Sequence, residues 1–196
     1  TQGFVYKKKS GEKKYNLTSP NIPFSEQDHL KTSKKSTAIL RLEGGFQLKM
    51  IPESLLVVRQ EPTKDEPMLV FSLIKGGVFI HTLKGSKNSM KTRGFQAKMG
   101  KITVRGTEGK IFIARQNDKD VPNGFVHSHS VEGSISHPFG ATKDFSPKET
   151  FYINTQKCLK IEKKSHKKWS KDLIWSFRGE IEPKYYDINF PDMDKE

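Results

Sequence analysis

The sequence predicts an all-β fold, with many short strands in a solenoid-like or double-layered sheet arrangement. Three observations point to it: apolar and polar residues alternate in several short runs, glycine or proline separates the runs, and the runs recur at regular spacing. The 15 Gly and 10 Pro fit strands joined by turns better than a helical bundle. At 196 residues we expect one core, and the 13 Phe supply much of its burial capacity.

The stretch 99–114 contains two of these runs in close succession. Residues 102–105 alternate in polarity, which is typical of a half-buried strand. In residues 111–114 the isoleucines share one face, while Phe112 and Ala114 occupy the other. We therefore expect both faces of this second strand to be covered.

A glycine turn separates the two runs. Gly106 and Gly109 bracket Thr107 and Glu108, and glycine adopts the positive φ values that reverse a chain without steric cost. Arg105 and Glu108 flank this turn, either as a charged interaction pair or as a structural pair that closes it. The central motif consists of Val104, Arg105, Gly106, Thr107 and Glu108.

Other runs along the chain have the same alternating character. Loops are expected between them where polar residues, prolines or glycines cluster, as at 60–67 and at 75–77. The strands expected from this pattern cover residues 3–6, 15–17, 37–42, 46–50, 54–58, 68–73, 78–81, 125–127, 131–136 and 149–154.

The order of these elements resembles the FecR domain family, extracytoplasmic sensory domains named for the regulator of ferric citrate uptake. Besides the central motif, the matching positions are Asp28, Leu30, Thr32, residues 37–42, Glu43, Gly44, residues 46–50, residues 54–58, Leu73, Lys75, Gly76, Val78, Val131, Gly133 and Ile135. The resemblance spans roughly residues 3–155 and implies stacked, solenoid-like sheets. It also implies a non-enzymatic sensory or scaffolding role in the bacterial cell envelope, with a protein partner there.

The chain is expected to divide into a FecR-like β domain, residues 1–156, and a C-terminal extension, residues 157–196. The extension is basic and then acidic, and its pattern allows one amphipathic helix or a strand. We expect it to pack its aromatic side chains onto the body of the domain. These are Trp169, Trp175, Tyr185, Tyr186 and Phe190.

The formal net charge is +13, and two lysine-rich runs lie near the ends of the chain: residues 1–20 carry +4 and residues 157–171 carry +6. Such lysine runs are often solvated arms, but interleaved lysines and aromatics also suit an anionic polymer. This alternative partner is a peptidoglycan-associated polymer or single-stranded nucleic acid. Its candidate contacts are Lys163, Lys164, Lys167, Lys168 and Lys171.

Three histidines form a minor alternative site. On one strand, His127 and His129 would project from the same face at a separation suited to a metal ion, and His137 could add a third ligand. The alternative is that they are solvent-facing polar residues of an edge strand. No nucleophile elbow, phosphate loop or dinucleotide motif occurs, so we expect neither enzymatic activity nor a cofactor.

Compartment signals are sparse. The single cysteine, Cys158, cannot form an internal disulfide, which is compatible with the cytoplasm and equally with the periplasm. No run approaches the roughly 20 apolar residues of a membrane-spanning helix, so no transmembrane segment is expected. The chain begins at Thr1, and we expect a signal or anchor upstream and a periplasmic or otherwise extracytoplasmic location.

Overall fold

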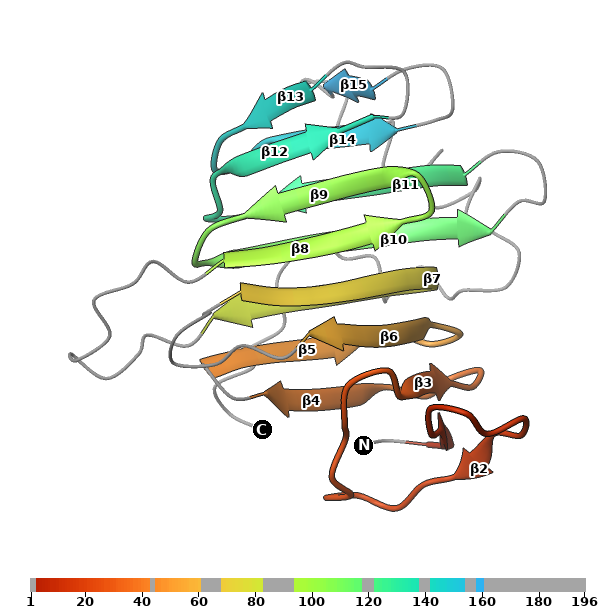
Figure 1. Cartoon of the computed structure of the whole chain (residues 1–196). Coiled ribbons are helices and arrows are strands. Elements are labelled where there is room, and N and C mark those ends of the chain that lie inside the picture. The colour runs from red at the N-terminus through yellow and green to blue at the C-terminus, as the bar shows by residue number, and fades with distance from the viewer. Residues whose placement is uncertain are drawn as a thin grey trace.

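The computed structural model describes residues 3–42, 45–60, 68–82, 94–117, 122–137, 142–153 and 158–160. Within these ranges the chain forms fifteen strands and no α-helix. The strands make two facing layers that are not closed into a barrel (Figure 1). The prediction of an all-β, double-layered fold is confirmed.

The first sheet contains the N-terminal hairpin at one end and a later hairpin at the other. In spatial order its strands are β2 (Asn16–Leu17), β1 (Val5–Lys8), β3 (His29–Thr32), β6 (Leu55–Gln60), the first half of β7 (Met68–Thr82), β8 (Gly94–Met99), β9 (Ile102–Gly106), β12 (Gly133–Ser136) and β13 (Thr142–Phe145).

The second sheet shares β7 with the first, because the second half of this long strand pairs with different neighbours. In spatial order the second sheet consists of β4 (Ala38–Leu42), β5 (Phe46–Met50), the second half of β7, β10 (Lys110–Asn117), β11 (Pro122–Ser128), β14 (Thr150–Ile153) and β15 (Cys158–Lys160). Among the described strands, β7 and β8 make the one parallel pair.

The chain alternates between the sheets in a regular way. It forms a hairpin in one sheet, crosses at a corner, and forms the next hairpin in the other sheet. The corners at 33–37 and 51–54 stack beside the bend of β7, whereas those at 107–109, 129–132 and 146–149 stack at the opposite edge. Each corner therefore contacts its neighbours rather than projecting as a free loop.

Buried hydroxyl groups hold the corners together. Ser54 is fully buried; its Oγ accepts a hydrogen bond from Gly77 N at 2.9 Å and donates one to Gly77 O at 3.0 Å. Thr32, also buried, accepts from Ser54 N at 2.9 Å and donates to Ile51 O at 2.7 Å through its Oγ1. These side chains pair backbone groups that water cannot reach.

Replacement of Ser54 by alanine is expected to lower the free energy of unfolding by about 2–3 kcal/mol, because two buried backbone groups of Gly77 lose their partner. Urea denaturation followed by circular dichroism measures this change. Ser10→Ala, at an exposed turn, is the control and should leave the stability unchanged. Equal stability of the two variants would contradict the role given to Ser54.

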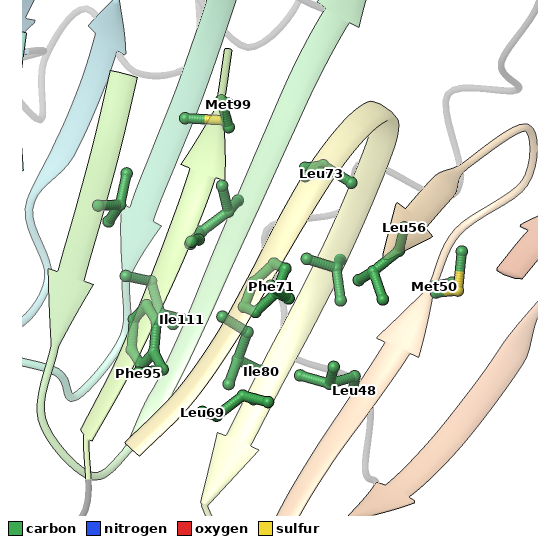
Figure 2. Close-up of a cluster of buried hydrophobic side chains, with 14 of the residues drawn as sticks. Leu48, Met50, Leu56, Leu69, Phe71, Leu73, Ile80, Phe95, Met99 and Ile111 are labelled. Atoms are coloured by element: carbon green, nitrogen blue, oxygen red, sulfur yellow. The ribbon is translucent and has the colours of Figure 1, made fainter. Parts of the chain in front are cut away.

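The hydrophobic core lies between the two sheets. Alternate residues of each strand point inward, as strand geometry requires. Figure 2 shows the central part of this core, with Phe71 and Leu69 of β7 and Phe95 of β8 facing Ile80 and Leu48 of the second sheet. The largest fully buried side chains are Phe46, Phe71, Phe95, Leu48, Met50, Leu56, Leu69, Leu73, Ile80, Met99, Ile102 and Ile111.

Most expected strands occur close to their predicted positions, and two connections differ from the prediction. The glycine turn at 106–109 does not fold β10 back onto β9, because β9 pairs with β8 and β12 while β10 pairs with β7 and β11. The glycines at 76–77 do not end a strand either; they bend β7 from one sheet into the other. Both faces of β10 are covered as predicted, since Phe112 and Ala114 are buried.

Candidate protein-interaction surface

The central motif, residues 104–108, ends β9 and enters a corner at the second edge. Thr107 ties this corner to the next one, since its N and its Oγ1 both donate to Glu132 O, at 3.0 and 3.2 Å. Gly109 connects this corner to the end of β7, because its N–H donates to Thr82 Oγ1 and its carbonyl accepts from Thr82 N. The motif thus maintains the backbone geometry of the crossing between sheets.

Two glycines face each other across β9 and β12. Gly106 is the cross-strand partner of Gly133, and aromatic rings occupy the space that side chains would need. A Cβ atom on Gly106 would lie 2.6 Å from the Phe95 ring, and one on Gly133 would lie 2.7 Å from the Phe145 ring. Only glycine fits at these two positions, because the backbones of β9 and β12 and the two phenylalanine rings approach closely.

Arg105 does not act inside the corner. Its side chain is exposed, and Nε donates to Gln96 Oε1 on β8 at 2.9 Å. The pair lies side by side on adjacent strands, because Gln96 and Arg105 are cross-strand partners. Arg105 therefore stabilises the outer surface of the first sheet.

The structure does not group the three histidines. β11 ends at Ser128, so His127 lies on the second sheet while His129 lies in the corner that follows. His137 follows β12 of the first sheet and is buried. His127 Nδ1 lies 2.8 Å from Thr150 Oγ1. No set of three or more potential metal ligands comes together within the described ranges, so the three-histidine site suggested by spacing is not formed.

The lysines suggested as anionic-polymer contacts lie outside the described residues. They are Lys163, Lys164, Lys167, Lys168 and Lys171. At the other end of the chain, Lys8 lies over the Tyr15 ring, 5.5 Å from its centroid, as does Lys31 at 5.9 Å. The neighbouring Lys9, Lys13 and Lys14 are exposed.

A groove of about 530 Å³ opens at the end of the two layers where β4 and the N-terminal hairpin lie. We call it the end groove. β4 forms one wall, and residues 18–24 form the other. The floor includes core side chains from both sheets, with Val5, Leu30 and Leu40 at its base. Ile22 projects at the rim with 46% of its surface exposed.

An ion pair fixes the wall of the end groove to the first sheet. Lys7 Nζ on β1 lies 2.8 Å from Asp28 Oδ2, donates to Pro23 O at 2.6 Å and lies 5.6 Å from the centroid of the Phe24 ring. Burial alone would raise the pKa of Asp28, but hydrogen bonds from Lys7, Ser25 N and Ser10 N, with the charge of Lys7, outweigh burial and lower this pKa.

This lowered pKa predicts a pH dependence of stability. The unfolded pKa of an aspartate is about 3.9, so the stabilisation by Asp28 is complete above that pH and is lost as the pH falls through the lower folded pKa. Asp28→Asn should cost about 1–3 kcal/mol at neutral pH, because a charge-assisted pair is lost. Urea denaturation should show that wild type and variant converge in stability in acid; a constant difference would contradict this account.

The end groove has the features of a surface that binds an extended protein segment. β4 pairs with β5 alone among the described strands, so its other edge faces the groove side of the sheet. The lining combines apolar side chains with polar ones such as Asn21 and Arg41. An unpaired strand edge accepts a further strand in many peptide complexes. The sequence signal for the groove is the run 20–24, where apolar Ile22 and Phe24 stand beside two prolines in a polar region.

No helix that is long and apolar enough to cross a membrane occurs in the described ranges.

Comparison with known proteins identifies similar folds rather than a family. No protein-family model matches the chain, and no curated protein matches it. Two crystal structures of a "putative anti-sigma factor" from Parabacteroides distasonis ATCC 8503 are similar to it, each with a TM-score of 0.55. Their sequence identities are 12% and 11%, over 72% and 73% of this chain. The similarity covers 62% and 63% of those chains, so this chain matches less than two thirds of their length.

Proposed function

We propose that this protein is a non-enzymatic, FecR-like regulatory domain of the bacterial cell envelope that acts through protein contacts. The observation that carries the proposal is the two-layer fold, which is similar over 72% of the chain to that of a protein described as a "putative anti-sigma factor". The FecR-like motifs support the same assignment. Thr32, Gly76 and Gly133 all lie where hydrogen bonds or close backbone contacts shape the corners.

The contact surface of this proposal is the end groove. It combines apolar and polar lining residues, an edge of β4 that pairs with no strand in the described ranges, and an exposed Ile22. Surfaces of this kind favour an extended segment of a partner, whose backbone pairs with the edge while alternate side chains enter the apolar space. The anionic-polymer alternative depends on lysines outside the described residues, and the similar structures give it no support.

The proposed role places the domain outside the cytoplasm. Cell fractionation tests this, with the protein produced from its complete gene in its own host. Recovery in the periplasmic or membrane-attached extracytoplasmic fraction is expected. Recovery with cytoplasmic proteins would contradict the proposed location.

Site-specific photo-crosslinking tests the contact surface. A benzophenone amino acid at Ile22 is expected to capture one protein in living cells, and mass spectrometry identifies it. The matched control is Met68, which is 41% exposed and lies on β7 outside the groove. Capture of the same proteins at both positions would contradict a specific surface at the end groove.

The captured protein is then purified and its affinity measured by calorimetry. Ile22→Lys should weaken binding about tenfold or more, because it places a charge in an apolar contact. Met68→Lys should bind as the wild type does. Equal affinities for the wild type and Ile22→Lys would contradict the proposed contact.

A further inference from the structure

The second sheet carries an apolar patch on the face that points away from the core. Side chains alternate along a strand. Ile80 and Ile111 point into the core, so the residues next to them in the sequence, Phe79 and Phe112, point outward. Cross-strand register brings these outward residues together, since Phe79 pairs with Phe112 and Ala114 pairs with Phe125. We call this set, with Ile51, the outer patch: Ile51, Phe79, Phe112, Ala114 and Phe125.

The outer patch is as inaccessible as the core itself. Phe79, Phe112 and Phe125 are 5%, 4% and 8% exposed. The Phe112 ring contacts both others, with centroid separations of 4.4 Å to Phe79 and 6.0 Å to Phe125. Gln47, on the same face of β5, is 5% exposed and its Oε1 is buried without a hydrogen-bond partner.

This burial requires a covering segment. The outer face of an antiparallel two-layer sheet normally meets water. Every strand that the structure describes lies within one of the two sheets, so none of them crosses the outer patch. Ring-to-ring contacts alone leave the exposed faces of a phenylalanine cluster accessible, so another group must lie over them.

We propose that the outer patch is the docking surface for the C-terminal segment of this same chain, residues 161–196. The segment continues directly from β15, the last strand of the same sheet. It holds both tryptophans of the chain and four further large rings, at Phe177, Tyr185, Tyr186 and Phe190. Such residues provide the large apolar surface needed to cover three phenylalanines.

Length and composition favour this segment over the other parts of the chain outside the described ranges. The longest internal one, residues 83–93, contains no aromatic residue, and the remaining ones have seven residues or fewer. Strands are spaced about 4.8 Å apart, so the path from β15 to β10 is short compared with the roughly 3.3 Å per residue that an extended chain spans. Residues 161–196 therefore have ample length to reach the whole patch.

Intramolecular photo-crosslinking of the full chain tests the proposal. A benzophenone amino acid at Phe125 should crosslink to a peptide within residues 161–196 of the same molecule. The control position is Phe4, which is 62% exposed on the N-terminal side of the first sheet and should give no such product. Crosslinks from Phe125 to a second copy, or to any segment other than 161–196, would overturn the proposal.

Tryptophan fluorescence of the unmodified full chain gives a second, independent readout. Trp169 and Trp175 are the two tryptophans of the chain, so the signal reports on this segment alone. Docking predicts blue-shifted emission and severalfold weaker acrylamide quenching than in urea. Phe112→Lys should restore strong quenching while the β-sheet circular dichroism persists. Quenching of the native wild type as strong as in urea would overturn the proposal.

Discussion

Replacement of Gly133 by alanine is expected to lower the free energy of unfolding by about 4 kcal/mol. A Cβ atom at this position would press against the Arg105 carbonyl oxygen, and would lie 2.9 Å from Gly106 Cα and 2.7 Å from the Phe145 ring. Two of these neighbours are backbone atoms of β9, which cannot move without breaking its pairing with β12. Urea or thermal denaturation of the variant measures the loss.

Gly124→Ala provides the matched control for this prediction. Gly124 also lies within a strand, but its nearest neighbour would be the flexible end of Met99, 3.1 Å from the new Cβ. We expect a loss of about 1 kcal/mol or less there. Similar stabilities of Gly133→Ala and Gly124→Ala would show that β9 and β12 are not as closely packed as described.

Replacement of Gly76 by alanine should cost about 3–4 kcal/mol, for two separate reasons. Gly76 has φ +81°, in the left-handed region that costs an L-residue about 1–2 kcal/mol. In addition, the new Cβ would lie 2.6 Å from Ser54 Cα and 2.8 Å from Ser54 Cβ. The substitution therefore forces apart the corner at 51–54 and the bend of β7, and denaturant unfolding measures the cost.

Gly11→Ala separates the two contributions. Gly11 has nearly the same φ, +82°, but no atom would lie within 4 Å of its Cβ. This variant should lose about 1–2 kcal/mol, from backbone strain alone. If Gly76→Ala and Gly11→Ala lost the same amount, the close contact between the bend of β7 and Ser54 would be contradicted.

The strand positions could be predicted from sequence because alternation is a local property. At β4 and β5, the inward residues from Ala38 to Met50 are the apolar ones, and their burial follows the predicted pattern. The same local signal predicted that Phe112 and Ala114 would be covered, as their burial confirms. Alternation does not indicate what lies over these two residues, because that depends on contacts distant in sequence.

The corners could not be predicted in the same way. A glycine turn between two strands has the same local chemistry whether the strands pair with each other or enter different sheets. At 106–109 the outcome is decided by Thr82 at the end of β7 and Glu132 in the next corner, which hydrogen-bond to this corner from distant parts of the chain. The buried hydroxyl of Ser54 makes a similar distant contact, with Gly77. No periodic signal reports such pairings.

In the candidate site, too, local sequence patterns predicted less than the two-sheet fold determines. The histidine pattern suggested a shared face, but β11 ends at Ser128 and so directs His129 into a corner. The end groove arises where the N-terminal hairpin meets β4, segments that the chain brings together only through the two-sheet topology. Ile22 and Phe24 line the groove together with β4, but no sequence motif links these segments.

Cross-strand nuclear Overhauser effects between backbone protons test the two-sheet crossing most directly. The two-sheet crossing predicts contacts of Val104 with Ala97 and Ile135 in the first sheet, and of Ile113 with Val78 and Val126 in the second. Regular contacts between residues 102–106 and residues 110–114, as in a hairpin, would contradict it.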